Sequence, residues 1–507
     1  MPNIATGAKS ALAYKEEITF NTAPSGNWTG MTFENETLGA TIPRVMSNEI
    51  RPTRTVPSIR GGNTGAGGNV TADLSVDRYG LFLKHLLAAT VVTTSTGLYA
   101  TGSLTSDNTN VSDADTVTIG SKTYTFKTAL TPTEGEVLIG ADADASLANL
   151  ILAINHTGTP DTDYKCATAH PTVTAETTIT AHVVVVNAIA AGTAGDSIAT
   201  TEAATTLSWG AATLASGANT GGAYTVSALT TATYQRGTVV SSNSRYYLVT
   251  DTGVVSSVGG GLTVTSGTQT LGTATFEYLS TTGVAIYEHV LPGGVDFPTG
   301  GISLEKKLAG ISSSTYAVFT GGRINSLDIT VRQEAIVQAA WAFLFVQPVD
   351  PISSTVAGTP TYAVEDPSMS YEAWITLGTD GTCRPATDIT LKIMNNLDDK
   401  VYTVNSRIRR EIPAGRRECS GNFTVFFEDE TELDAFTAET ENEMTISFNR
   451  NGEYLAFVMG ETKLNGDGTP KISGPGVIKA SFDYMAFQQD GTTDITATMI
   501  SLEPTLR

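Results

Sequence analysis

Three parts of the chain have residue types and spacings that could support chemistry. The run Gly61–Gly68 has the composition of a phosphate-binding loop, Asp142 and Asp144 have the first spacing of a calcium loop, and five histidines are potential metal ligands. Each part lacks what its chemistry needs. No Gly-Lys-Ser/Thr follows the glycines, the twelfth calcium position is Ala153, and the histidines show no HExxH spacing. We therefore expect no catalytic, cofactor-binding or metal-binding residue and no enzyme activity.

The glycines and the two aspartates have simpler interpretations. We expect Gly61–Gly68 to be a flexible or tightly turning loop. Asp144 is expected to cap a helix whose apolar face consists of Leu147, Leu150, Ile151 and Ile154.

Two arginine-rich segments recur in a chain whose net charge is -21. Because arginine pairs bidentately with carboxylates, we hypothesise that they contact the acidic surface of a neighbouring subunit. The alternative is that they are local surface charges. The candidate contact residues are Arg51, Arg54 and Arg60 in the first segment and Arg407, Arg409, Arg410, Arg416 and Arg417 in the second.

The arginines belong to a module that occurs twice. Ser47-Asn48-Glu49-Ile50-Arg51 precedes Gly68-Asn69-Val70-Thr71, and Asn405-Ser406-Arg407-Ile408-Arg409 precedes Gly421-Asn422-Phe423-Thr424. A helix signal follows each, at Asp77 and near Glu430. An internal duplication usually means that the copies stack or pack side by side, which favours an assembly-building protein.

The two helix signals differ in character. After Asp77, which we expect to be the N-cap, an amphipathic stripe predicts a helix lying on a core. The second has eight carboxylates in sixteen positions from Glu428 to Glu443, and a solvated helix face is the expected interpretation. The stripe consists of Tyr79, Phe82, Leu83, Leu86 and Leu87.

A long stretch separates the parts of the first copy. Removing residues 96–283 leaves 162 residues for the first copy, against 157 for residues 351–507, and this near equality supports an insertion after the first helix. We predict four parts: a first copy from 1–95 and 284–350, an inserted α+β module at 96–222, a small all-β module at 223–283, and a second copy at 351–507.

Composition limits the fold and the possible partners. Hydrophobic residues make up 40% and charged residues only 16%, and the abundance of Thr, Ser, Ala and Gly favours a mainly β chain. The negative charge argues against gripping nucleic-acid phosphates. Three cysteines without CxxC spacing predict neither a disulfide framework nor a zinc site. No apolar run approaches a membrane span, and we expect a soluble chain without an export signal.

The repeated module resembles the tail tube (major tail) protein of long, non-contractile-tailed bacteriophages, the siphophages. The resemblance rests on the run from Ser47 to the helix at Tyr79 and on Phe319-Thr320-Gly321-Gly322-Arg323-Ile324-Asn325-Ser326-Leu327, and it covers both copies, about 320 residues. The insert at 115–209 is similar to modules that decorate phage structural proteins. The segment 234–278 is similar to a small β module of phage tail and carbohydrate-binding proteins.

The resemblance implies a fold and an assembly. Each copy would be a β-sandwich or partly closed barrel with one flanking helix, and its sheets would join those of neighbours into a ring. Rings would stack into a tube through which DNA passes on ejection, without specific binding. Because such rings have six tube domains, a chain with two should close as a trimer with pseudo-sixfold symmetry; a hexamer is the alternative. The resemblance also implies a tape measure protein inside the tube, terminator and baseplate proteins at its ends, and assembly in the host cytoplasm before incorporation into the virion.

A reading from another class remains open. A Thr-, Ser- and Gly-rich acidic β chain with small modules could be a bacterial surface adhesin or surface-layer protein that binds glycans. In that case Tyr234, Tyr246 and Tyr247 would be available to stack on a sugar, whereas packing in a β core is the alternative.

Overall fold

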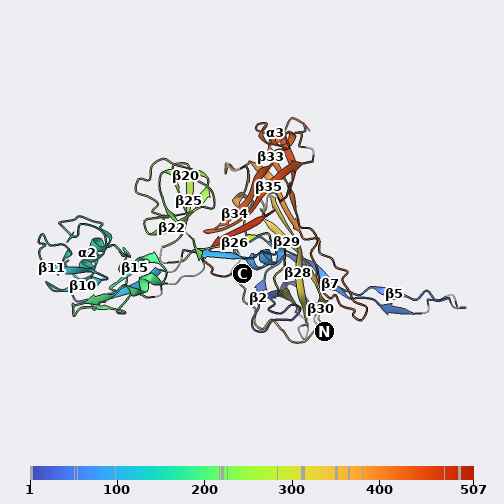
Figure 1. The fold of residues 1–507 in the computed structure, drawn as a ribbon, viewed down its shortest axis with the longest axis horizontal. Helices are drawn as coiled ribbons and strands as arrows, with labels where there is room; N and C mark the ends of the chain where they lie inside the picture. The colour runs from blue at the N-terminus through green and yellow to red at the C-terminus, as the bar shows by residue number, and fades with distance from the viewer. Residues whose placement is uncertain are drawn as a thin grey trace. The chain divides into compact units, whose positions relative to one another are not determined.

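A computed structural model describes residues 4–50, 52–53, 55–56, 58–96, 99–215, 217, 222–224, 226–281, 284–309, 315–348, 352–362, 366–378, 381–466, 468–472, 474–488 and 493–506. The chain is mainly β, as predicted (Figure 1). It divides into two compact units: unit 1 contains Met1–Val92, Gln235–Gly237 and His289–Arg507, and unit 2 contains Thr93–Tyr234 and Thr238–Glu288. No helix in the described ranges is long and apolar enough to cross a membrane.

Unit 1 contains both copies. The elements of the first copy are η1 (Gly7–Lys9), β1 (Ala11–Glu16), β2 (Thr29–Met31), β3 (Asn35–Glu36), β4 (Gly39–Thr41), β5 (Arg44–Met46), β6 (Ile59–Gly61), β7 (Gly65–Asp73), α1 (Gly80–Leu86), β27 (Ile302–Leu308), β28 (Thr315–Arg332), β29 (Gln338–Phe345) and β30 (Gln347–Pro348). Those of the second copy are η3 (Ser370–Glu372), β31 (Ala373–Leu377), β32 (Ala386–Met394), β33 (Glu418–Phe426), α3 (Thr431–Thr437), β34 (Asn442–Arg450), β35 (Glu453–Asn465), β36 (Lys479–Ala486) and β37 (Thr496–Ser501). Strands β8 (Val92–Ser95) and β26 (Tyr287–Pro292) lie at the unit boundary.

The strand topology of unit 1 occurs twice, which confirms the duplication. In the first copy, antiparallel pairing joins β1 to β27, β27 to β28, β28 to β29, and β29 to β7. In the second copy the same order runs β31, β34, β35, β36, β33. A 3-10 turn, η1 or η3, precedes the first strand of each copy. A short last strand, β30 or β37, pairs with the long strand β28 or β35.

The helix that follows the repeated motif packs differently in the two copies. In the first copy the predicted apolar stripe is buried, and the Phe82 ring lies 5.3 Å from Trp341, 5.5 Å from Phe343 and 4.7 Å from Tyr14. The N-cap is Tyr79 and not Asp77, whose carboxylate accepts a hydrogen bond from Ser75 instead. Helix α3 has no buried residue, and Asp434 is exposed, in agreement with the predicted solvated face. Glu432 departs from this prediction, because its side chain is only 12% exposed and its carboxylate lies 3.5 Å from Arg384 Nε.

Unit 2 holds an α+β module and a small all-β module. The first contains β9 (Tyr99–Ser106), β10 (Thr116–Ile119), β11 (Lys122–Lys127), β12 (Glu136–Leu138), α2 (Ala143–Asn155), β13 (Tyr164–Lys165), β14 (Val173–Ala175), β15 (Val183–Ala191), η2 (Thr193–Ser197), β16 (Thr200–Glu202), β17 (Leu207–Trp209) and β18 (Gly222–Ala223). The second contains β19 (Ser227–Ala228), β20 (Ala232–Tyr234), β21 (Val239–Ser242), β22 (Arg245–Asp251), β23 (Gly253–Val255), β24 (Thr268–Leu271) and β25 (Ala274–Thr281).

Two expectations about unit 2 have clear outcomes. Helix α2 forms and buries its predicted apolar face, but its N-cap is Asp142, which accepts a hydrogen bond from the Ala145 backbone N–H at 2.8 Å. Asp144 lies in the first turn and contacts His182 instead. In the small module Tyr234, Tyr246 and Tyr247 are only 7%, 2% and 0% exposed. Tyr234 and Tyr247 pack in the β core, and the hydroxyl of Tyr246 forms a hydrogen bond with that of Tyr99 at 2.6 Å, so none of the three rings offers a sugar-stacking surface.

Candidate assembly interface

The Gly-Asn-x-Thr motif has the same structural role in both copies. The Asn69 backbone N–H donates to Thr37 Oγ1 at 2.9 Å, and the Asn422 N–H donates to Thr390 Oγ1 at the same distance. The preceding glycine lies against the backbone of that threonine: a Cβ on Gly68 would lie 2.5 Å from Thr37 O, and one on Gly421 would lie 2.0 Å from Thr390 O. The motif therefore allows a neighbouring strand to approach closely.

Only residues 62–64 of the predicted loop Gly61–Gly68 lie outside strands, because Gly61 ends β6. Gly65–Gly68 belong to β7, which pairs with β29 on one side and with β4 on the other. Gly68 has φ +149°, in a region that favours glycine, and its position between two strands excludes a side chain. Close strand packing, and not turn formation, explains why glycines collect here.

One sheet continues from the first copy into the second. Residues Ser326–Arg332 of β28 pair antiparallel with Met394–Asp388 of β32. The side chains of Leu327, Ile329 and Leu391 at this junction are at most 1% exposed. Lys392 Nζ lies 3.8 Å from Asp328 Oδ1 on the partner strand. The junction is thus a full β ladder with a buried apolar face, of the kind that holds a sheet interior together.

The turn after β28 strengthens the same junction. Val337 N donates to Ser368 O at 2.9 Å, and Ser370 N donates to Ala335 O at 3.0 Å. The first copy therefore contacts the second at the 3-10 turn that precedes β31 as well as along β32.

Arg409 lies at the base of the second arginine-rich segment and is 6% exposed. Its guanidinium donates to Ala66 O and to Phe345 O, each at 2.9 Å, and its Nε donates to Asp399 O at 2.8 Å. Both Ala66 and Phe345 belong to the first copy. Arg409 thus fastens the two copies of one chain to each other.

Arg417 is also engaged within the chain. It forms a two-pronged ion pair with Asp494 and donates to Leu87 O at 3.1 Å and Gly294 O at 3.0 Å. Burial lowers the pKa of this guanidinium, but hydrogen bonding and charge from Asp494 outweigh it and raise the pKa. Arg407 Nε donates to Gly62 O at 3.1 Å from an exposed position.

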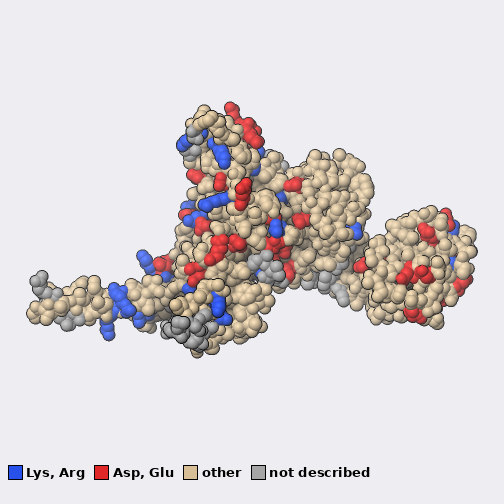
Figure 2. All heavy atoms as spheres, turned by 180° about the vertical axis from the view of Figure 1, so that it is seen from behind, with Lys and Arg blue, Asp and Glu red and all other residues tan. Residues whose placement is uncertain are grey.

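The remaining arginines of the hypothesis lie on the surface or outside the described residues. Arg60, Arg410 and Arg416 are exposed, whereas Arg51 and Arg54 are outside the described residues. Arg60 belongs to β6, which pairs with β5 in a hairpin that leaves the sheet (Figure 1). Figure 2 shows basic side chains along this hairpin. Val45, Met46 and Ile59 on its strands are each more than half exposed.

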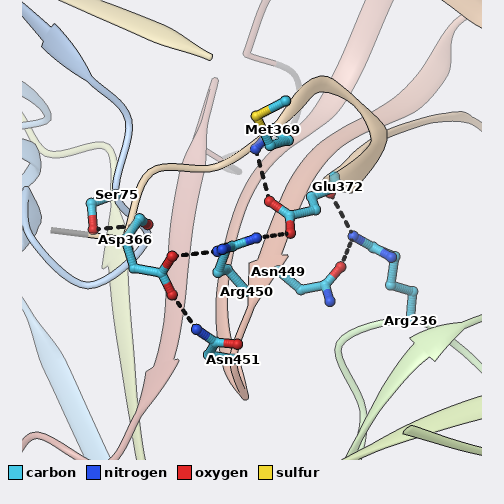
Figure 3. Close-up of polar contacts among 8 residues, drawn as sticks. All are labelled: Ser75, Arg236, Asp366, Met369, Glu372, Asn449, Arg450 and Asn451. Carbon is cyan, nitrogen blue, oxygen red and sulfur yellow. Dashed lines mark hydrogen bonds and ion pairs between the residues drawn. The ribbon is translucent and has the colours of Figure 1, made fainter. Parts of the chain in front are cut away.

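A polar network holds the segment that leads into the second copy (Figure 3). Arg450 Nε lies 2.5 Å from Asp366 Oδ1, and Arg450 Nη1 lies 2.6 Å from Glu372 Oε1. Asp366 O accepts a hydrogen bond from Ser75 Oγ at 3.5 Å, and Asn451 also contacts the Asp366 carboxylate. Arg450 thus binds both carboxylates of the segment, and Ser75 of the first copy binds its backbone.

Arg236 extends this network from the tripeptide Gln235–Gly237. It donates to Glu372 O at 3.0 Å and Ser447 Oγ at 3.1 Å, and contacts Asn449. Its guanidinium lies 4.7 Å from the centre of the Trp374 ring. Nearby, burial and then the charge of Asp77 raise the pKa of Glu453 to about 8, so this carboxyl keeps its proton at neutral pH. The network joins the segment to the strands beside it. In the described ranges no group of three His, Cys, Asp or Glu residues could hold a metal ion.

Sequence reasoning missed the partners of the repeated motif. Thr37 and Thr390 precede their motifs by about 30 residues and carry no local signal. One signal was available: each motif asparagine follows its threonine by 32 residues, from Thr37 to Asn69 and from Thr390 to Asn422.

Comparison with known proteins agrees with this duplicated architecture. The family model described as phage tail tube protein matches residues 7–244 and matches again at residues 225–486. No curated protein matches the chain. The two matches together cover nearly the whole chain, and the second includes all strands of the second copy except β37. The chain therefore belongs to the phage tail tube protein family.

Proposed function

We propose that three copies of this chain close into a ring of six tube domains and that the rings stack into the tail tube of a siphophage. The observation that carries this proposal is the β28–β32 junction, where two copies of one topology already share a sheet. Two adjacent members of a ring are thereby joined in one chain, and closed rings leave no sheet edge exposed. The proposal keeps the predicted domains: residues 1–95 and 284–350 form the first tube domain, and residues 351–507 form the second. Residues 96–222 and 223–283 form the two inserted modules.

The tube serves as the conduit for DNA ejection into the host. A net charge of -21 supports this role, because a wall with excess carboxylates repels phosphate and lets DNA slide past. The tape measure protein occupies the lumen during assembly in the host cytoplasm, and terminator and baseplate proteins close the ends. The inserted modules of residues 96–283 decorate the outer surface.

Electron microscopy of the purified protein tests the tube itself. We expect hollow tubes of uniform diameter in negative stain after concentration or storage. A protein that stays monomeric under all such conditions, and binds glycans instead, would support the adhesin reading.

The exposed arginines are proposed to contact carboxylates of a neighbouring subunit. The four exposed candidates are Arg60, Arg407, Arg410 and Arg416. Arg409 and Arg417 are less accessible to a neighbouring subunit, because their guanidinium groups bind within their own chain. Arg51 and Arg54 stay in the hypothesis because they lie between β5 and β6 in the sequence.

A charge reversal tests this contact. Arg60→Glu/Arg410→Glu should reduce the fraction of protein in tubes by about tenfold or more, since a like-charge contact costs at least ~1.4 kcal/mol. Sedimentation of tubes from soluble protein measures the effect. The double variant Arg60→Lys/Arg410→Lys keeps the charge and should assemble nearly normally. Equal assembly of the glutamate and lysine variants would exclude these arginines from the interface.

A further inference from the structure

Two asparagines of the chain are each followed by a glycine, at Asn451-Gly452 and at Asn465-Gly466. In such a pair the backbone nitrogen of the glycine can attack the side-chain carbonyl carbon of the asparagine, and no Cβ shields that nitrogen. The two pairs lie at opposite ends of β35, because Asn451 shortly precedes the strand and Asn465 is its last residue. Their local structures therefore decide which pair can react.

The first pair lies in a closed hairpin turn. Asn451 and Gly452, with φ of 48° and 80°, form the two-residue turn between β34 and β35. The side-chain amide of Asn451 donates a hydrogen bond to the Asp366 carboxylate, and Gly452 is buried. Reaction at Asn451 requires the loss of this charge-assisted hydrogen bond and a change in the conformation of the turn.

The second pair has no comparable restraint. Asn465 and Gly466 are both exposed, and Gly466 lies beyond the end of the strand with φ +88°. Within the described ranges the side-chain amide of Asn465 forms no hydrogen bond. This amide can therefore rotate toward the nitrogen of Gly466 without the loss of a contact of the kind that holds Asn451.

The strand pairing turns the N–H of Gly466 away from β36. The Phe487 N–H donates to Glu461 O at 3.0 Å. The same register places Asn465 opposite Asp483. Because hydrogen-bonded pairs recur at every second position of an antiparallel ladder, Asn465 and Asp483 form such a pair, and the next N–H, that of Gly466, points to the other side. The attacking nitrogen therefore does not have to leave this ladder before it reacts.

The surroundings of Asn465 show what its conversion to an acid would do. Directly paired residues point to the same face of a sheet, so the Asn465 side chain lies beside that of Asp483. Both residues line a hollow of about 400 Å³, together with Asp328 and Lys392. The Asp483 carboxylate also lies against Gly466, where a Cβ would be 2.8 Å from Oδ2. A carboxylate at position 465 would thus be the third in this hollow, against one ammonium group.

We propose that Asn465 is a site of spontaneous deamidation and that the hairpin turn protects Asn451 from the same reaction. The Gly466 nitrogen gives up its proton to hydroxide and attacks Cγ of Asn465. A nitrogen–carbon bond forms and closes a succinimide ring, the bond from Cγ to the side-chain nitrogen breaks, and this nitrogen takes a proton from water and leaves as ammonia. Water then adds to either ring carbonyl and opens the ring. The product is aspartate or isoaspartate at this position, which gives the chain one additional negative charge.

Ageing of the purified chain tests the proposal. At mildly alkaline pH, where more of the glycine nitrogen is deprotonated, an acidic form should accumulate and separate on ion exchange. Peptide mapping by mass spectrometry should place the change at Asn465, with conversion at Asn451 at least about tenfold slower because a charged hydrogen bond must break first. Labelling by isoaspartyl methyltransferase should mark the peptide that contains position 465. In urea, where the turn is lost, both asparagines should convert at similar rates.

Matched variants assign the acidic form to one residue. Asn465→Gln should stop its accumulation, because glutamine would have to close a larger ring, whereas Asn451→Gln should age like the unmodified protein. Equal accumulation of the acidic form in both variants would overturn the proposal. Peptide maps of the unmodified protein decide the matter even where a variant fails to fold: equal conversion of Asn451 and Asn465 in the folded chain, or conversion only in urea, would contradict a reactive site at Asn465 and a protected one at Asn451.

Discussion

Replacing Gly421 by alanine is expected to lower the free energy of unfolding by about 3 kcal/mol or more, because the new Cβ overpacks a closed strand interface. That Cβ would lie 2.0 Å from Thr390 O and 2.5 Å from the Tyr484 hydroxyl. Thr390 O is backbone within a ladder, so relief requires that β32 and β33 separate. Strand β32 also forms the junction between the copies, so we expect the substitution to destabilise the whole of unit 1.

Thermal unfolding followed by circular dichroism measures this effect. Gly460→Ala is the matched control, since Gly460 also lies within a long strand, β35, and a Cβ there would meet nothing within 4 Å. The control should unfold close to the temperature of the unmodified protein. Similar unfolding temperatures for the two variants would show that the close approach of β32 to β33 is not what requires glycine in the motif.

Replacing Arg409 by methionine should cost about 3 kcal/mol of stability, because two buried carbonyl groups and one part-buried carbonyl group lose their donor at once. Methionine keeps much of the side-chain volume, so the loss reports on hydrogen bonds more than on packing. Two of the acceptors, Ala66 O and Phe345 O, belong to the first copy, and the third, Asp399 O, belongs to the second. The variant should therefore loosen the contact between the two copies.

The neighbouring residue provides the control for this experiment. Arg410 is exposed, and Arg410→Met should change stability by no more than about 0.5 kcal/mol. Urea unfolding of both variants gives the comparison. A large loss for Arg410→Met together with a small one for Arg409→Met would contradict the assignment of Arg409 as the residue that fastens the copies.

Much of the local structure could be predicted from the sequence because its signals are periodic and short in range. The stripe from Tyr79 to Leu87 identified α1 and its buried face, and the two Gly-Asn-x-Thr strands revealed the duplication. Both helix N-caps lie two residues from the predicted positions. At α2 the carboxylate of Asp142, and not that of Asp144, binds the first-turn N–H, whereas the α1 N-cap Tyr79 makes no side-chain cap hydrogen bond.

The misinterpretations have one physical origin, which is contact between residues far apart in the chain. The sequence predicts a loop at Gly65–Gly68 because a run of glycines has no local preference for a strand. These residues form a strand because they pair with β29 and because Thr37 lies close to Gly68. The sequence places Arg409 among the candidate contacts to a neighbouring subunit, because nothing near it in sequence shows that Ala66 and Phe345 of its own chain offer carbonyls. The β28–β32 junction likewise joins residues that are 56 to 68 positions apart.

The number of chains in one ring tests the central claim most directly. Cryo-electron microscopy of assembled tubes, at a resolution that distinguishes the two copies, gives this number. We predict three chains per ring, with six similar tube domains and the inserted modules attached to every second one. Rings of six chains would contradict the claim that each chain supplies two members of the ring.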